Sequence, residues 1–172
     1  MDFFETVRRR KSYRGFSSID LETESLRRIL EAANSAPSAG NLQAYEIVVV
    51  SDSGKKKALA EACFDQKFIA SAKLVFVFFA NPERSAEYGE RGEKLFCIQD
   101  ATIAAAYTQL AAAANGLASV WVGAFDPEAV KKILKSPEKL IPVAVIPLGF
   151  AAIEAEKTPR RALDNLVHED GF

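Results

Sequence analysis

The chain has 172 residues, of which 49% are hydrophobic and 26% are charged, a balance typical of one compact domain. Its 22 basic and 23 acidic residues give a net charge of -1, which excludes a global positive field for nucleic acid or an anionic membrane. One histidine, His168, and two cysteines without metal-site spacing exclude a multi-histidine centre and argue against hydrolytic triads. The acidic N-terminus, and apolar runs far shorter than the ~20 residues of a membrane helix, predict a cytoplasmic protein.

The hydrophobic periodicity predicts helices and strands that alternate along the first half of the chain. A short helix from residue 3 ends in a basic run at residues 8–11, a loop follows over 12–18, and a second helix covers about 22–35. Proline and glycine within residues 36–41 end that helix. A strand is predicted over residues 45–50, a helix over 53–62 and a buried strand over 74–80.

The second half begins with the longest helical pattern, over residues 92–115, with Gly116 as its C-terminal stop. Its many alanines fit either a dimer seam or close packing beneath the domain's own sheet, and composition does not choose between them. A short strand over 120–122, a helix capped by Asp126 with Pro127 following, and a final strand over 141–150 come next. The polar residues 151–172 cannot fold alone, so we expect a single domain with a core over 1–150 and a C-terminal arm over 151–172.

Two cationic clusters, near opposite ends of the chain, could bind an anion. Residues 10–14, Arg-Lys-Ser-Tyr-Arg, offer three cations and a serine hydroxyl, a set suited to charge-assisted hydrogen bonds with a phosphate. A solvated basic helix end, favourable to the helix dipole, is the alternative. Residues 157–161 are also cationic and could meet the same phosphate or form a solubilising tail.

Two further segments could contact a polar ring. Residues 37–43 combine a rigid proline, a flexible glycine and polar side chains just before a strand, which suits a heterocycle or an ordinary helix-to-strand turn. Gly123 follows the strand predicted over 120–122, where an exposed backbone N–H could approach a flat ligand. Spacing alone leaves both alternatives open.

Taken in order, these segments resemble the nitroreductase family of FMN-dependent oxidoreductases over nearly the whole chain. The family pattern Arg-x-Ser-x-Arg is matched by Arg10, Ser12 and Arg14, and the pattern Pro-Ser-x-x-Asn-x-Gln by Pro37, Ser38, Asn41 and Gln43. Gln99 and Asp100, together with residues 116–123, resemble the family's central segment, and Gly149 with residues 159–161 resembles its C-terminal one.

The resemblance implies an α+β fold with a mixed, mainly antiparallel central sheet flanked by helices. It further implies a homodimer with FMN at the subunit interface and a C-terminal extension that crosses to the partner. NADH or NADPH would donate a hydride, which passes through flavin N5 to a small electrophilic acceptor such as a nitroaromatic or a quinone, with ping-pong kinetics. No catalytic side chain and no metal are implied.

The residues that the resemblance implies for cofactor binding form four groups. Those at the phosphate are Arg10, Ser12 and Arg160, with Lys11 and Arg161 as supports. Those at the pyrimidine edge are Arg14 and, as weaker candidates, Gln66 and Lys67. Those from the partner subunit are Pro37, Ser38 and Asn41, with Gln43 in the same segment. Those whose backbone faces the N5 edge are Val122, Gly123 and Ala124.

The chain departs from the family in places that bear on substrate shape. Ala44-Tyr45 stands where many relatives have Pro-Trp, and residues 167–170 lack the aromatic residue that relatives often carry after the histidine. Residues 81–92, with Tyr88, are the only obvious remnant of a lid. Enone reduction, reductive dehalogenation and flavin cleavage are alternative reactions on the same fold. A nucleotide- or nucleic-acid-binding module, or a flavin-storing or flavin-sensing protein, is the alternative from another class.

Overall fold

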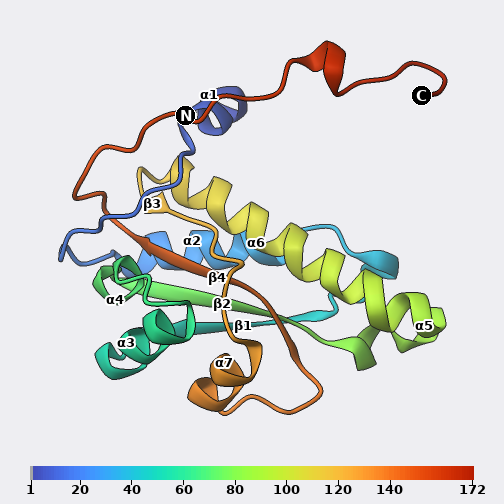
Figure 1. Ribbon diagram of the computed structural model, residues 1–172, viewed down its shortest axis with the longest axis horizontal. Helices are drawn as coiled ribbons and strands as arrows, with labels where there is room; N and C mark the ends of the chain where they lie inside the picture. The colour runs from blue at the N-terminus through green and yellow to red at the C-terminus, as the bar shows by residue number, and fades with distance from the viewer. Residues whose placement is uncertain (1) are drawn as a thin grey trace.

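The computed structural model describes residues 2–172 and consists of a four-stranded antiparallel sheet between two layers of helices, with strand order β1-β2-β4-β3 (Figure 1). The strands are β1 (Tyr45–Val50), β2 (Leu74–Ala80), β3 (Ala118–Ser119) and β4 (Ile141–Gly149). The helices are α1 (Phe3–Arg9), α2 (Thr23–Asn34), α3 (Ser53–Ala62), α4 (Phe68–Ser71), α5 (Gly89–Arg91), α6 (Cys97–Ala114) and α7 (Pro127–Leu134). Turns of 3-10 helix cover Ala39–Asn41, Pro82–Tyr88 and Leu163–Asn165, and a π-helical turn covers Gly92–Phe96.

The central strand β2 divides the core into two halves. Every residue of β2 is buried, because β1 and β4 flank it and helices cover both faces of the sheet. Phe76 and Phe78 pack with α2 and α6, whereas Val77 and Phe79, on the alternate face, pack with α3, α4 and α7. The expected antiparallel sheet flanked by helices is confirmed, and the pairing Ser12–Ser119 is a parallel bridge beside it.

Helix α6 lies directly under the sheet and is built for close packing. Ala101, Ala104 and Ala105 are buried against the strands, where small side chains let the two backbones approach. Gly116 ends the helix as predicted: its φ is +73°, and the N–H groups of Gly116 and Leu117 bond the last-turn carbonyls of Ala113 and Ala112 at 3.1 and 2.9 Å. Packing beneath the sheet therefore accounts for much of the alanine pattern.

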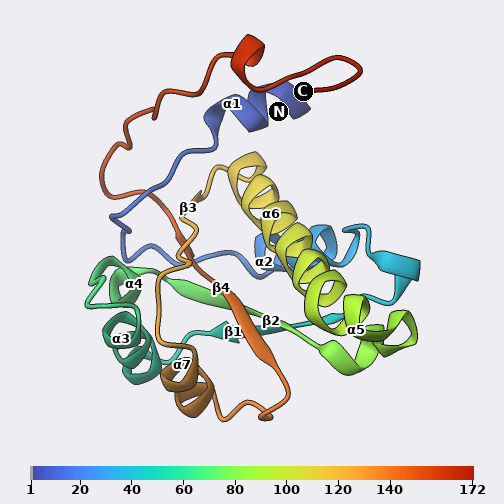
Figure 2. The same cartoon turned by 45° about the vertical axis from the view of Figure 1, so that its right-hand side comes forward.

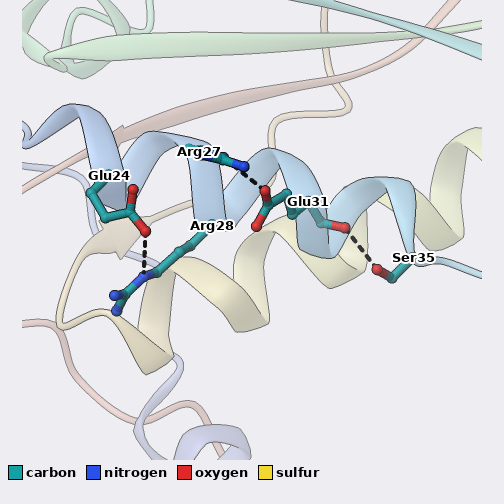
Figure 3. A network of polar contacts seen from close by, with 5 residues as sticks. All are labelled: Glu24, Arg27, Arg28, Glu31 and Ser35. Atoms are coloured by element: carbon teal, nitrogen blue, oxygen red, sulfur yellow. Dashed lines mark hydrogen bonds and ion pairs between the residues drawn. The ribbon is translucent and has the colours of Figure 1, made fainter.

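Helix α2 covers α6 and carries a polar outer face. Ile29 and Ala33 are buried against α6. Figure 3 shows the contacts of the outer face: Arg28 to Glu24 at 3.2 Å, Arg27 to Glu31 at 2.8 Å, and the Ser35 hydroxyl to the Glu31 carbonyl at 2.8 Å. Exposed pairs of this kind contribute about 0.3–0.5 kcal/mol each, so burial of the inner face holds α2 in place.

Two predicted elements differ from the structure. The strand expected over residues 120–122 is displaced, because hydrogen-bonded pairing occurs at β3 and again at Val122, which bridges Val145 in the same register. β-propensity marked Val120 and Trp121, but the partner strand decides which residues pair. The long helix begins five residues later than expected, because Gly92–Phe96 is a π-helical turn whose Gly92 carbonyl accepts from Ser85 Oγ at 2.9 Å.

The two ends of the chain meet at the edge of the fold. The Ala152 N–H donates to the Gly15 carbonyl at 3.0 Å, and the Ser17 N–H donates to the Phe150 carbonyl at 2.9 Å. Beyond this crossing, the arm runs past α1 and away from the sheet (Figures 1 and 2), and residues 156–172 are all exposed. No helix within residues 2–172 is long and apolar enough to span a membrane.

Candidate functional site

The two cationic clusters lie in one pocket of about 360 Å³. It is lined by Val7, Arg8, Arg10, Lys11 and Ser12 from the N-terminal segment and by Glu156, Lys157, Thr158 and Arg160 from the arm. Five cations and two hydroxyl groups against one carboxylate form a set suited to a phosphate. The structure thus brings Arg10, Lys11, Ser12 and Arg160 together, whereas Arg14 and Arg161 are exposed outside the pocket lining.

Local interactions on both sides hold this pocket. Asp2 caps the start of α1, where its carboxylate accepts the Glu5 N–H at 2.8 Å, and Arg10 caps the end of the helix. Ser12 then pairs with Ser119, and the Tyr13 N–H donates to the Ser119 carbonyl at 3.1 Å, which ties the segment to the sheet. The crossing of residues 15–17 with 150–152 directs the arm back over α1.

Lys11 is already paired within the protein. Its Nζ contacts Glu154 Oε1 at 2.6 Å. The hydrogen bond that Lys11 donates to Glu154 raises the pKa of Lys11 and outweighs the opposing effect of desolvation. The positive charge of Lys11 is therefore partly offset by Glu154, whereas the other four cations of the pocket lining, Arg8, Arg10, Lys157 and Arg160, form no ion pair within residues 2–172.

A second group of predicted residues meets at residues 122–124, shortly after β3. Gln66 Nε2 donates to the Cys63 carbonyl at 2.9 Å and to the Ala124 carbonyl at 3.4 Å. The N–H and C=O of Val122 are both bonded to Val145, at 2.9 and 3.0 Å. Within residues 2–172, the N–H groups of the exposed Gly123 and Ala124 have no acceptor, so these two amides are free to donate to a ligand. Lys67 is exposed nearby in the chain.

These two groups lie along one continuous segment. Ser119 pairs with Ser12 at the cationic pocket, and Gly123 follows four residues later in extended chain, a span of about 13 Å. An elongated ligand with a phosphate at one end and hydrogen-bond acceptors at the other would match this arrangement.

The third group, residues 37–43, forms a loop at the start of α6. Gln43 Nε2 donates to the Asn41 carbonyl at 2.9 Å, and the Gln43 N–H donates to Ser38 Oγ at 3.0 Å. Pro37 and Ser38 also line a largely apolar cavity of about 530 Å³ with Phe96 and the first half of α6.

One protomer does not bring this loop to the cationic pocket. The N-terminal cations lie beside Ala113 and Gly116, at the end of α6, whereas the loop contacts Asp100 in its first turn. Thirteen residues of α-helix separate these positions, or about 20 Å. A site that uses both groups must therefore take them from two copies of the chain.

Some residues escaped the sequence prediction, and others have no place in a reaction. Arg8 and Glu156 line the pocket although neither was predicted as a site residue, and the basic run over residues 8–11 was the available signal for Arg8. Burial raises the pKa of the Cys63 thiol to about 12, and burial also raises the pKa of Cys97, so neither is a ready nucleophile. Residues 2–172 contain no cluster of histidine, cysteine or acidic side chains that could hold a metal ion.

Comparison with known proteins agrees with the order of these segments. The sequence profile of the nitroreductase family matches residues 7–97 and 62–150. The chain belongs to the nitroreductase family.

Three relatives show how far the similarity of this nitroreductase-family protein extends. An NADH dehydrogenase of Thermus thermophilus is 33% identical over 187 residues, which cover 92% of this chain and 91% of the relative. An FMN reductase (NADPH) of Bacillus subtilis is 28% identical and covers 98% and 73% of the two chains. The structure of NADPH:FMN oxidoreductase from Vibrio harveyi complexed with NAD+ has a TM-score of 0.91 at 28% identity, covering 99% of this chain and 77% of that one.

Proposed function

We propose that this protein is an FMN-dependent NAD(P)H oxidoreductase that acts as a homodimer. The observation that carries the proposal is the convergence of Arg10, Lys11 and Ser12 with Lys157 and Arg160 in one cationic pocket. Relatives named FMN reductase (NADPH) and NADPH:FMN oxidoreductase support the choice of flavin and nicotinamide. When bound, FMN supplies the redox chemistry, accepting a hydride from NADH or NADPH and passing it to a small electrophile such as a nitroaromatic or a quinone.

The protein's part is to bind and orient the flavin. The phosphate would occupy the cationic pocket, and the ring would lie along the segment that leads to the free amides of Gly123 and Ala124. Arg14, Gln66 and Lys67 would meet the pyrimidine edge, where positive charge favours the reduced flavin. Arg161, outside the pocket lining, would support the phosphate only through its field.

The energetics require burial of the ring as well as binding of the phosphate. Charge-assisted hydrogen bonds contribute about 1.5–3 kcal/mol each, so two or three contribute about 5 kcal/mol. Micromolar affinity corresponds to about 8 kcal/mol, and the difference must come from removing the isoalloxazine from water. A single protomer offers only an open shelf at Gly123, since that residue is exposed.

A second copy of the chain would close this shelf. The apolar side chains of Phe4 on α1 and Leu163 on the arm are each 71% exposed, and the apolar cavity beside Pro37 is open. Exposed apolar groups on three separate elements would support contact with a partner. In a two-fold symmetric dimer, residues 37–43 of one protomer would complete the pocket of the other, which gives two identical sites. The arm of each protomer (residues 151–172) would cross the core of its partner (residues 1–150).

The test combines flavin binding, turnover and assembly. Purified protein should bind FMN, sediment as a dimer, and oxidise NADH or NADPH when menadione or nitrofurazone is present, with parallel double-reciprocal plots. Anaerobic reduction by each nicotinamide would identify the donor. A monomer that takes up no FMN would refute the proposal, and a flavin-loaded dimer that no nicotinamide reduces would indicate storage in place of catalysis.

A further inference from the structure

Asp100 is a buried carboxylate that holds both ends of the loop at residues 37–43. It lies in the first turn of α6 and is 2% exposed. Its Oδ1 accepts the Ala39 N–H at 3.0 Å, and its Oδ2 accepts the Ala44 N–H at 3.1 Å. A buried carboxylate must be hydrogen-bonded, and here one oxygen has its partner within the loop and the other has its partner directly after the loop.

The loop between these two anchors has a shape that it would not keep unaided. Gly40, Asn41 and Gln43 all have left-handed backbone, with φ of 55°, 59° and 50°. This conformation is unfavourable for residues with a side chain, and such strain persists only where surrounding contacts impose it. Asp100, on α6, supplies two of those contacts through its hydrogen bonds with the Ala39 and Ala44 N–H groups.

The segment before α6 constrains the loop from the other side. Arg84 Nε donates to the Leu42 carbonyl at 3.2 Å, and a Cβ added at Gly40 would collide with the Tyr88 hydroxyl. Tyr88 in turn packs edge-on against Phe96, with ring centroids 5.4 Å apart. The loop is therefore clamped between α6 and residues 82–96, and Asp100 is the acidic member of the clamp.

We propose that Asp100 is a positioning residue for the flavin: it fixes residues 37–43 in the shape in which they reach the FMN bound by the partner subunit. This inference rests on the proposed function. Asp100 lies about 20 Å from the cationic pocket of its own protomer. The inference is that Asp100 affects binding of the flavin ring in the pocket of the partner subunit.

The direct test is Asp100→Asn, which keeps the volume of the side chain. An amide offers one acceptor oxygen and turns its NH2 toward a backbone N–H, so one loop amide loses its bond. The dissociation constants of FMN and of riboflavin should both rise about tenfold, because the loop meets the ring and not the phosphate. Equal binding of both flavins by wild type and variant would overturn the inference.

Glu93→Gln is the matched control. It makes the same chemical change at an exposed carboxylate within the π-helical turn that precedes α6, with no side-chain hydrogen bond or ion pair to the loop among the described residues. Both dissociation constants should stay at their wild-type values, and circular dichroism and sedimentation should match the wild type in both variants. If Glu93→Gln weakened binding as much as Asp100→Asn, general charge loss would replace positioning as the explanation.

Ala39→Pro tests the same hydrogen bond from the loop side if Asp100→Asn does not fold. It removes the N–H that Asp100 Oδ1 accepts and leaves the carboxylate in place. Ser38 is extended, with φ -142° and ψ 158°, and residue 39 is the first of a helical turn, a position that accepts proline. Weaker binding of both flavins is expected, and unchanged binding would overturn the inference.

Mixed dimers show whether Asp100 acts on the partner's flavin. Pairing one Asp100→Asn protomer with one Arg160→Gln protomer gives one unmodified and one doubly changed site if the loop acts across the interface. Half of the sites should then bind FMN with wild-type affinity. If no site does so, the loop acts within its own subunit and the inference fails. Wild-type protein that binds no FMN would refute the proposed function itself, and the inference with it.

Discussion

Replacing Arg160 by glutamine tests the cationic pocket at its most distant contributor in the sequence. Arg160 comes from the arm and lines the same pocket as Arg10 and Ser12, which precede it by about 150 residues. Glutamine keeps a polar side chain of similar reach but loses the charge and the guanidinium fork. The change therefore removes one charge-assisted contact to a bound phosphate while leaving the backbone crossing of the arm intact.

The magnitude follows from the composition of the pocket. Lys11 is paired with Glu154 at 2.6 Å, so Arg160 is one of the four cations of the lining that form no ion pair within residues 2–172. Loss of one such contact costs about 1.5–3 kcal/mol, or a rise of about 10- to 100-fold in the dissociation constant of FMN. Riboflavin lacks the phosphate, so its dissociation constant should not change.

The assay is titration of the flavin-free protein with FMN and with riboflavin at low and high salt, with binding monitored by the quenching of flavin fluorescence. The wild type should lose FMN affinity as salt rises, and Arg160→Gln should lose less. Arg161→Gln is the control, since that neighbouring arginine lies outside the pocket lining and should change FMN affinity by less than about twofold. An unchanged FMN affinity in Arg160→Gln, or a parallel loss of riboflavin affinity, would refute the assignment of this pocket to the phosphate.

Three further predictions follow from particular residues. Gly116→Ala should lower the free energy of unfolding by about 1 kcal/mol, because φ is +73°, and the loss is due to backbone strain alone since nothing contacts the added Cβ. Denaturant titration measures this free energy, and an unchanged value would contradict the strain argument. Deleting residues 156–172 removes Lys157, Arg160 and the exposed Leu163, so FMN binding should be lost and dimers weakened in sedimentation; a flavin-loaded dimer would count against the arm's role. Cys63, with its pKa raised to about 12, should resist thiol reagents near pH ~8 until the protein unfolds, and rapid labelling of the native protein at this site would contradict its burial. The contribution of Cys63 to the free energy of unfolding should be intact below about pH 9 and should fall by about 1.4 kcal/mol per pH unit as the pH rises toward 12.

The elements that the sequence predicted well are those with strong local signals. The bounds of β1, α3 and β2 agree with the predicted ranges, because alternating or continuous apolar runs bounded by polar residues define them without reference to any partner. Asp126 caps α7 with two backbone hydrogen bonds, at 2.9 and 3.0 Å, and Pro127 follows as expected. Gly116 ends α6 for the same kind of local reason.

Features that depend on a partner were predicted less well. The displaced β3 pairs where β4 offers free backbone groups, and the π-helical turn at Gly92–Phe96 depends on Ser85, which lies outside the helical pattern. Val122 shows the same limit at the candidate site. Its amide looked free for a ligand in the sequence, yet the structure bonds it to Val145 and leaves the next two amides unpaired.

The sequence by itself determined which chemistry the protein can offer: two clusters of cations, a polar loop after Pro37, and a single histidine, too few for a multi-histidine metal centre. Only the tertiary structure decided that residues 10–12 and 157–160 share a pocket, that Arg161 stays outside its lining, and that Asp100 clamps the loop about 20 Å away. The reason is physical. Local propensity depends on near neighbours in the chain, whereas contacts between residues about 150 positions apart exist only because helices and strands bury their apolar faces against one another.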